Sequence, residues 1–379
     1  MFLGEVLARG RRTVAGGIRA AGLSTQFRSC YTAVAAAGKK ADKIAAQLLI
    51  AVIKPLVSRS GSAYVYGHVF VVLALLVKHK AWGVIALPLL ARLSVRKTDL
   101  PSIDPKHRPE FRTKLDMGVE LLRWASNLLK SLGQPIWVVV DGAYAKAPFL
   151  KPAMALGMTV VSRLRKDAAL WSVPGPRRKG QRGRPRIYGA DRIDLAKRAG
   201  QRRGWTTGTF DLYGKSTIKR YKPFPATWGP VGGVIRVVLV DEPTGWIAYF
   251  CTDVSASVAD ILTTVADRFS LEITFRDCKE IVGAGQQQVR FVWANIGAFP
   301  ICVWTFTMTE AWAWSRTDQE LVDRSTSPWD TPSRRPRHAD KRRAWRREML
   351  GEEIRAVLRP GVTEAEIQAA AERLLSLAA

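Results

Sequence analysis

The sequence predicts an α/β fold in which helices pack on a mixed β-sheet. Three observations support this prediction: short apolar runs rich in aromatic and β-branched residues, intervening segments whose apolar residues recur at three- and four-residue spacing, and a chain long enough for a large core. With 379 residues, of which 47% are hydrophobic, the chain is neither too short nor too polar to fold.

The first part of the chain is predicted to change from helix to strand. Residues 1–57 are rich in Ala and include DKIAAQLLIAVIKPLV, whose apolar residues have helical spacing. Two adjacent strands follow in AYVYGHVFVVLALLVKH and WGVIALPLLARLSV, and we place the first at 64–77. A helix is predicted at 111–133. The stretch PIWVVVDGAYAK at 135–146 is predicted to be a buried strand that ends in Asp141 and a turn.

The second part of the chain contains a basic segment and two long helical patterns. A short helix in AKAPFLKPAMALG and a strand in MTVVSRLRKDAALW lead to residues 174–230, which are dense in Arg, Gly and Pro. A hairpin is predicted at 232–253, turning at DEPTG, and a long helix with a Ser cap at 255–283. The apolar run at 291–314 contains Asn, Pro and Glu, which favours a buried helix over a membrane span.

These patterns divide the chain into five regions. They are a helical N-terminal region, the first part of the core, a basic β-rich insertion, a core helix with the helix after it, and a basic tail with a C-terminal helix. We place them at residues 1–57, 58–173, 174–253, 254–315 and 316–379.

Charge and cysteine usage narrow the classes of function. The formal net charge is +27, and such a charge destabilises a compact fold unless a polyanion screens it. Nucleic acid is therefore the first expected partner and an anionic membrane surface the second. The four cysteines are scattered without CxxC spacing, which argues against a structural zinc site. We expect no structural disulfides and a cytoplasmic location, associated with the nucleoid.

Asp141 and Glu272 are the candidate catalytic residues. Asp141 closes an apolar strand and precedes Gly142, at the kind of strand end where α/β folds present functional side chains. Glu272 lies on the predicted helix at 255–283, on nearly the same face as Arg268 and Lys279. Paired carboxylates bind divalent cations in phosphoryl-transfer sites. The alternative is an ordinary Arg268–Glu272 surface pair, worth a few tenths of a kcal/mol.

The motifs resemble those of bacterial insertion-sequence transposases of the DDE type. The family's second acid lies in a strand-end D-G/A-x-F/Y element, which DGAY at 141–144 matches. Its third acid lies in a Y-x2-R-x3-E-x6-K signature, which Arg268, Glu272 and Lys279 match while Val265 stands at the Tyr position. The likeness covers roughly residues 60–315.

The resemblance implies a ribonuclease H-like core that cleaves DNA and transfers strands at transposon ends. It implies Mg²⁺ or Mn²⁺ as the cofactor, with Asp141 and Glu272 as metal ligands, and a dimer on DNA without a membrane partner. The residues that we expect to contact DNA are Arg268, Lys279, Arg276, Arg177, Arg178, Lys179, Arg182, Arg184 and Arg186.

The first acid of the family is missing from this sequence. It belongs on the first core strand, yet no Asp or Glu occurs between Asp42 and Asp99. Asp42 lies at a predicted helix start, and Asp99 and Asp104 lie in a loop after the strands. We therefore expect that the segment with the first strand is absent and that the chain is a degraded, inactive transposase. The alternative is a non-catalytic DNA-binding protein derived from one.

Two further basic runs have open interpretations. RGRPRIYG at 182–189 contains a Gly-Arg-Pro core like that of AT-rich minor-groove hooks, but a solvated loop touching phosphates is the favoured interpretation. RRPRHADKRRAWRRE at 334–348 is either a DNA contact or a flexible solvated tail.

Overall fold

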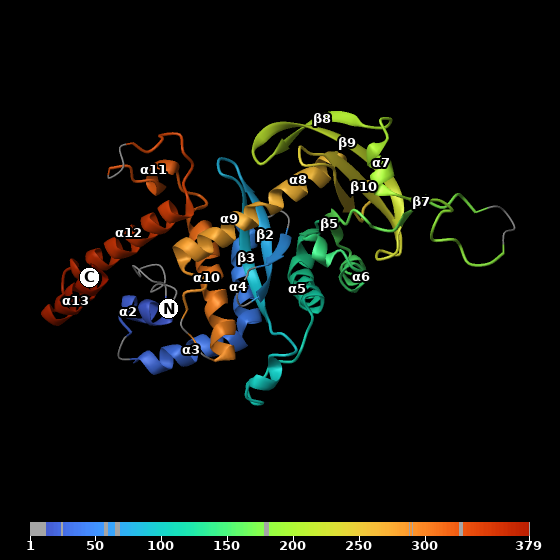
Figure 1. Ribbon diagram of the computed structural model, residues 1–379. Coiled ribbons are helices and arrows are strands. Elements are labelled where there is room, and N and C mark those ends of the chain that lie inside the picture. Colours follow the sequence, from blue (N-terminus) through green and yellow to red (C-terminus); the bar gives the residue numbers. More distant parts are fainter. Residues whose placement is uncertain are drawn as a thin grey trace.

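One mixed sheet organises the described part of the chain (Figure 1). The structure is a computed structural model that describes residues 13–23, 26–56, 60–64, 69–177, 182–287, 289, 291–325 and 329–378. Within these residues the sheet has eleven strands in the order β3-β2-β1-β4-β5-β11-β10-β9-β6-β7, and β8 pairs with β9.

The first five strands form the expected core. Their bounds are β1 Ser60–Tyr64, β2 Val69–His79, β3 Gly83–Ser94, β4 Trp137–Val140 and β5 Thr159–Leu164. β1 is parallel to β4 and β4 to β5, whereas β2 is antiparallel to both β1 and β3. This arrangement is consistent with a ribonuclease H-like DDE fold, so the predicted mixed α/β class is confirmed at that level.

The expectation of a missing first strand is wrong. β1 lies between β2 and β4, where its residues pair with Val71–Leu75 on one side and with Val138 and Val139 on the other. The sequence of β1, SGSAY, is short and consists of small and polar residues before Tyr64, so it lacks the apolar pattern by which strands are recognised. The strand is present, and what it lacks is an acid.

The remaining strands extend the same sheet beyond β5. Their bounds are β6 Leu170–Trp171, β7 Arg192–Ile193, β8 Thr206–Leu212, β9 Lys215–Trp228, β10 Gly233–Asp241 and β11 Ile247–Cys251. β10 and β11 form the hairpin predicted at 232–253, and β11 joins β5 in antiparallel pairing. The basic β-rich segment therefore continues the core sheet.

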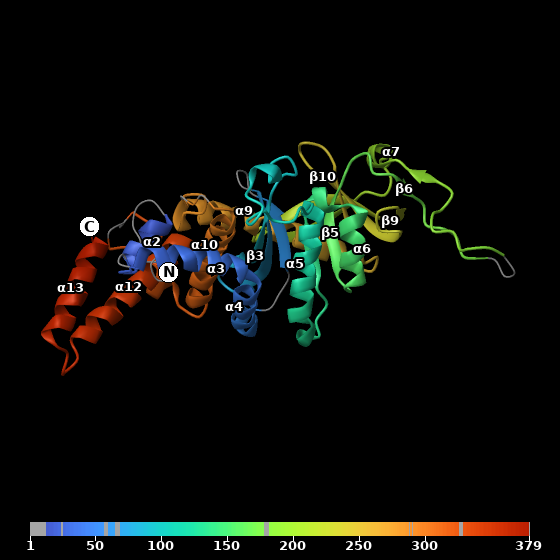
Figure 2. The ribbon, with the colours of Figure 1, turned by 90° about the horizontal axis from the view of Figure 1, so that it is seen from below.

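Helices precede the sheet, connect its strands and follow it. Their bounds are α2 Val14–Ala20, α3 Phe27–Lys39, α4 Ala41–Leu56, α5 Lys114–Leu129, α6 Ala147–Ala155, α7 Leu195–Gly200, α8 Val258–Arg268, α9 Ser270–Asp277, α10 Val292–Ala313, α11 Asp318–Leu321, α12 His338–Val357 and α13 Glu364–Ala378. α5 packs on β2 and β3, and α6 on β5, while α8 crosses β4, β5 and β11. Figure 2 shows α12 and α13 at one end of the molecule and the β6–β7 region at the other.

The outer edge of β3 is covered by side chains from α9 and α10. The pairing of β2 with β3 shifts next to Leu73, which leaves Leu89 out of register. Trp304 donates its Nε1–H to the Leu89 carbonyl at 2.6 Å, and Thr307 donates to the Pro88 carbonyl at 2.7 Å. Thr274 of α9 donates to the Ala86 carbonyl at 2.9 Å. Buried edge carbonyls that would otherwise lack partners are satisfied in this way.

α10 is the buried helix predicted at 291–314. In the described residues it is the one helix long and apolar enough to cross a membrane, and 72% of its most apolar window is buried inside the protein. Gly297 lets it approach α3 closely, because a Cβ at that position would lie 2.1 Å from the Val34 carbonyl oxygen.

Candidate functional site

Asp141 directly follows β4 and begins a tight turn. Its carboxylate is exposed and accepts the Ala143 N–H at 2.9 Å, which caps the 3₁₀ turn Gly142–Tyr144. Tyr144 is fully buried and anchors this turn in the core. Gly142 passes close to β5, since a Cβ there would lie 3.2 Å from the Arg163 carbonyl oxygen. The backbone therefore presents Asp141 at the end of its strand, as predicted.

Glu272 lies just after a break between two helices. The predicted helix at 255–283 is divided at Phe269 into α8 and α9 and ends in a π-helical turn at Cys278–Val282. Arg268 ends α8, and its Nη1 lies 3.6 Å from Glu272 Oε1. The Glu272 side chain is 53% exposed. The Arg268–Glu272 surface pair is therefore present in the structure. The Glu272 carboxylate remains accessible to solvent.

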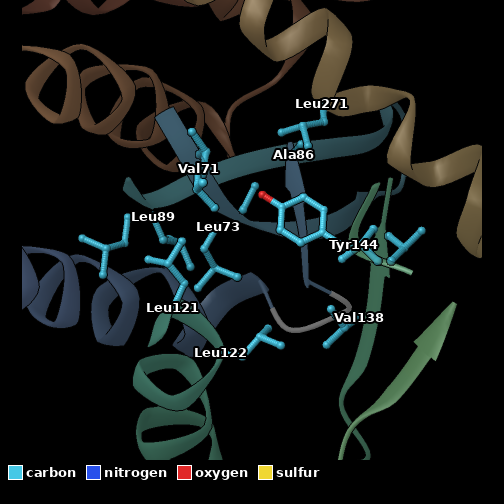
Figure 3. Close-up of a cluster of buried hydrophobic side chains, with 14 of the residues drawn as sticks. Val71, Leu73, Ala86, Leu89, Leu121, Leu122, Val138, Tyr144 and Leu271 are labelled. Carbon is cyan, nitrogen blue, oxygen red and sulfur yellow. The ribbon is translucent and has the colours of Figure 1, made fainter. Parts of the chain in front are cut away.

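The segments that carry the two acids pack into the same hydrophobic core. Tyr144, three residues after Asp141, and Leu271, next to Glu272, belong to one cluster of buried side chains. Figure 3 shows the Tyr144 ring and Leu271 in this cluster, together with Ala86 of β3. α8 also crosses β4 directly. Both segments are therefore anchored in the same hydrophobic core.

The residues present do not complete the metal site that the resemblance implies. Among the described residues, no three His, Cys, Asp or Glu side chains gather so that they could hold a metal ion. Carboxylate oxygens are the ligands that Mg²⁺ prefers, but Mg²⁺ requires near-octahedral geometry. Asp141 and Glu272 match the second and third acids of the family's motifs, and no residue of β1 is an acid that could match the first.

The resemblance places the family's first acid on the first core strand, and β1 is the strand that precedes β2 and pairs with β4. Gly61 pairs with Val139 in the parallel register, and continuing that register places Ala63 level with Asp141. The other early acids are engaged elsewhere: Asp42 accepts from Arg92 at 2.7 Å, and Asp99 lies in the exposed loop after β3. The residue that continues this register is an alanine, so the sequence of β1 supplies no acid there.

The predicted DNA contacts on α9 and its continuation are exposed. Arg276 is exposed and lies 3.3 Å from Asp277 Oδ1, and Lys279 is exposed within the π turn. Glu272 and Lys279 were predicted to share one face of a regular α-helix. The π turn changes the number of residues per turn, so that spacing no longer applies up to Lys279. Val265, at the Tyr position of the signature, packs against a buried cluster under α8.

Four of the other predicted DNA contacts lie on an extended arm between β6 and β7. β6 and β7 pair at its base, and the chain between them reaches away from the sheet (Figures 1 and 2). Arg182, Arg184 and Arg186 are exposed, and Arg177 donates to the Gly183 carbonyl at 2.8 Å. Arg178 and Lys179 lie outside the described residues.

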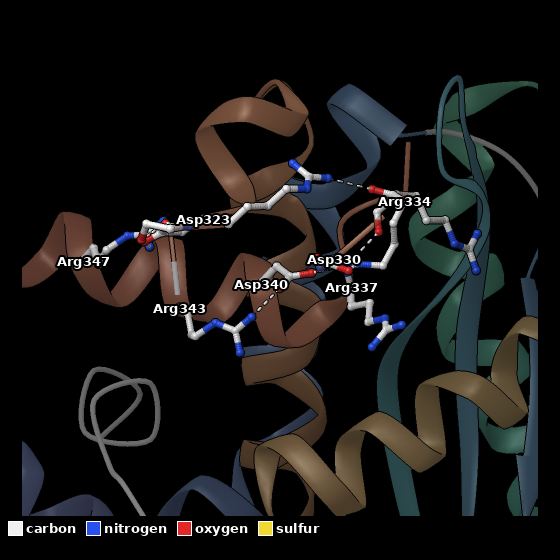
Figure 4. Close-up of polar contacts among 10 residues, drawn as sticks. Asp323, Asp330, Arg334, Arg337, Asp340, Arg343 and Arg347 are labelled. Atoms are coloured by element: carbon white, nitrogen blue, oxygen red, sulfur yellow. Dashed lines mark hydrogen bonds and ion pairs between the residues drawn. The ribbon is translucent and has the colours of Figure 1, made fainter. Parts of the chain in front are cut away.

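The interpretation of 334–348 as a flexible tail is wrong. α12 begins at His338, and His338, Asp340, Lys341 and Arg342 are buried. Figure 4 shows part of the ionic network around the start of α12, where Arg334 binds both Asp330 and Asp340 at 2.6 Å. This binding raises the Arg334 pKa, and Arg334 and the Arg337 N–H help to hold the Asp340 pKa low although burial opposes it.

The sequence analysis did not identify Glu310 as the partner that allows His338 and Lys341 to be buried. Glu310 of α10 accepts from Lys341 Nζ at 2.5 Å and contacts His338 Nδ1 at 2.7 Å. Burial disfavours its ionised form, but Lys341 and His338 outweigh that effect and lower the Glu310 pKa to about 2. The signal was a single Glu in an otherwise apolar run, which indicates a buried ion pair.

Part of the sheet matches a known protein family. Residues 63–210 match the family model described as DDE superfamily endonuclease. This match supports a DDE-type transposase family. The matched range begins within β1, includes Asp141 and ends in β8 of the basic segment, so Glu272 and the Arg268–Lys279 signature lie outside it. No curated protein matches the chain.

The order of the first five strands is consistent with a DDE-type core. A DDE endonuclease implies a DNA substrate and generally a divalent metal, in agreement with the partner and cofactor expected from the sequence.

Proposed function

We propose that the protein is a DDE-type transposase chain that binds DNA and has lost the ability to cleave it on its own. The observation that carries this proposal is the absence of an acid from β1, SGSAY, beside Asp141. Both Asp141 and Glu272 are exposed, which supports their assignment as the two remaining acids of the site for cleavage and strand transfer that the resemblance implies. With one carboxylate missing, the reacting oxygens of a phosphodiester have no complete set of groups to position them.

DNA binding is the activity that the surface supports. The net charge of +27 favours a polyanionic partner, and exposed basic side chains occur on α9, on its π turn and on the arm. We infer that Arg268, Arg276 and Lys279 contact the backbone near Glu272 and that the arm residues Arg182, Arg184 and Arg186 contact it farther away.

The proposal extends to the origin of the chain. The signature Arg268, Glu272 and Lys279 supports descent from an insertion-sequence transposase, which binds the ends of its element as a dimer. The DNA of the nucleoid would then be its cellular partner.

The test is a paired measurement on the full chain. Binding to duplex DNA is measured by fluorescence anisotropy at several salt concentrations, and nicking of supercoiled plasmid is measured with Mg²⁺ and with Mn²⁺. We expect salt-dependent binding without nicking. Nicking that disappears in Asp141→Asn would show that the chain is an active nuclease, and salt-independent or absent binding would reject the DNA-binding function.

A further inference from the structure

The arm between β6 and β7, residues 172–190, combines a high positive charge with exposure. Its sequence contains six Lys or Arg and no Asp or Glu. Three of these residues, Arg182, Arg184 and Arg186, are exposed and form no hydrogen bond or ion pair with the rest of the described chain. Figures 1 and 2 show the arm reaching away from the sheet. The arm therefore presents unengaged guanidinium groups away from the body of the protein.

The base of the arm is fixed by contacts between its two sides. The Ser172 N–H donates to the Asp191 carbonyl, and the Gly189 N–H donates to the Ser172 carbonyl, both at 2.8 Å. Gly189 approaches so closely that a Cβ on it would lie 2.2 Å from Ser172 Oγ. The Tyr188 ring lies against Trp171 of β6, with ring centroids 6.5 Å apart. The sheet therefore determines where the arm leaves the protein.

The chain is narrow around Arg184. Its neighbours are Gly183, which has no side chain, and Pro185, whose ring is compact. Gly183 has a φ of +94°, and its carbonyl accepts from Arg177 at 2.8 Å. Pro185 disfavours helical backbone at Arg184, and residues 182–187 form neither helix nor strand. One arginine is thus presented between two small residues on irregular backbone.

A·T-rich DNA has a groove that matches these properties. The minor groove is about 6 Å wide, whereas it is the wider major groove that admits a helix. In A·T tracts the minor groove is narrower still, and its enhanced negative potential attracts arginine. Only a thin segment of chain can follow an arginine into such a groove. A phosphate contact needs a positive charge but sets no limit on the size of the neighbouring residues, so the small residues around Arg184 favour the groove over the phosphate contact that the sequence alone favoured.

We propose that the arm inserts Arg184 into the minor groove of A·T-rich duplex DNA. The proposal rests on the DNA binding proposed above and refines the contact inferred there for this residue. The Arg184 guanidinium donates to adenine N3 and thymine O2, the acceptors that face the groove. Arg182 and Arg186 contact the sugar–phosphate backbones that border it. Guanine places its 2-amino group, a donor, in the same groove, so a G·C pair opposes the guanidinium.

The test compares three duplexes of equal length by fluorescence anisotropy with the full chain at one salt concentration. Their central tracts consist of A·T, G·C or inosine·cytosine pairs. Inosine is guanine without the 2-amino group, so an inosine·cytosine pair keeps the major-groove pattern of G·C but resembles A·T in the minor groove. We expect similar Kd values for the A·T and inosine·cytosine duplexes and a Kd about tenfold higher for the G·C duplex.

Arg184→Gln tests whether the preference comes from the arm. The variant should bind all three duplexes with equal Kd, because the remaining contacts are made to the backbone, which carries no base information directly. The matched control is Arg359→Gln, which removes one exposed arginine just beyond α12 and should keep the preference. Arg184 is exposed and engaged with no other described residue, so its replacement leaves the fold intact, which circular dichroism verifies.

Three results would overturn the proposal. The first is equal binding of the three duplexes by the wild type, and the second is a preference that survives Arg184→Gln. The third is inosine·cytosine binding as weakly as G·C, because that pattern reports the major groove. In all three cases the protein still binds DNA, so the proposed function stands. A wild type that binds none of the duplexes would instead reject the DNA-binding function itself, and this proposal with it.

Discussion

Lys341 Nζ lies 2.5 Å from Glu310 Oε2, and this buried ion pair joins α12 to α10. Both side chains are only 3% exposed. Two charges removed from water are stable only when they are paired and hydrogen-bonded. The basic C-terminal region is therefore part of the folded core because one acid lies in the otherwise apolar helix α10.

We predict that Glu310→Gln destabilises the protein strongly at neutral pH. The substitution leaves Lys341 buried without a counterion, which costs about 3–5 kcal/mol. Urea unfolding followed by tryptophan fluorescence measures the change. Glu364→Gln, at an exposed position in α13, is the control and should change the free energy of unfolding by less than about 0.5 kcal/mol. Equal stability of the two variants would mean that the pair does not hold α12.

The same pair predicts a dependence of stability on pH. The Glu310 pKa is about 2 in the folded protein, below its ordinary value of 4.5. A lowered folded pKa stabilises the fold above about pH 4.5, and that contribution disappears as the pH falls from about 4.5 towards 2. The difference in unfolding free energy between the wild type and Glu310→Gln should therefore shrink over this interval. A difference that stays constant between pH 6 and pH 3 would contradict the assignment, with both proteins followed by urea unfolding.

The close approach of α3 and α10 predicts a second stability effect. Gly297→Ala would place a methyl group 2.1 Å from the Val34 carbonyl oxygen, so the two helices must move apart. We expect a loss of about 1–3 kcal/mol, as for overpacking in other cores. Gly175→Ala is the control, because a Cβ at Gly175 meets nothing within 4 Å. Thermal unfolding of both variants measures the effect, and an equal midpoint for the two would reject the close contact.

The basic arm predicts how DNA affinity responds to salt. Each phosphate contact on duplex DNA contributes about −0.9 to the slope of log K against log salt. Replacing Arg184 and Arg186 by Gln should therefore reduce the slope by up to about 2 if both contact phosphates. The control replaces Arg355 and Arg359, two exposed arginines at the end of α12 and just beyond it. Equal slopes for the two double variants, measured by fluorescence anisotropy, would exclude the arm from the interface.

The sequence predicted those helices and strands whose own residues carry a clear apolar pattern. β2 and β3 were found because their runs are almost continuously apolar, and α10 because its few polar residues occur within a long apolar run. β1 was missed because a short strand of Ser, Gly and Ala is recognised only by its pairing with β2 and β4. The break at Phe269 and the π turn were missed because apolar spacing predicts a helix without its local geometry.

For the functional residues, too, local patterns were predicted and features that depend on distant partners were missed. Asp141 at the end of β4 was predicted correctly from the strand pattern, since a Gly follows the acid. A cavity of about 700 Å³, whose lining includes His338, was not predicted because its walls come from α9, α10, α12 and the β2–β3 turn, which are separated by long stretches of sequence. The burial of α12 depends on Glu310, and nothing local to 334–348 indicates that partner.

The last prediction concerns the missing acid. Continuing the register of β1 and β4 places position 63 level with Asp141, whereas position 62 lies on the other face because successive residues of a strand alternate. Ala63→Asp would therefore add a carboxylate beside Asp141, and Ser62→Asp would add the same charge on the wrong face. We expect Ala63→Asp to show plasmid nicking that needs Mg²⁺ or Mn²⁺ and disappears when Asp141→Asn is added. Ser62→Asp should remain inactive, and calorimetry with Mn²⁺ should detect tighter metal binding in Ala63→Asp alone.

Equal binding of Mn²⁺ by the two variants would mean that β1 does not occupy the position of the first catalytic strand. In that case one absent carboxylate would not explain the inactivity of the chain.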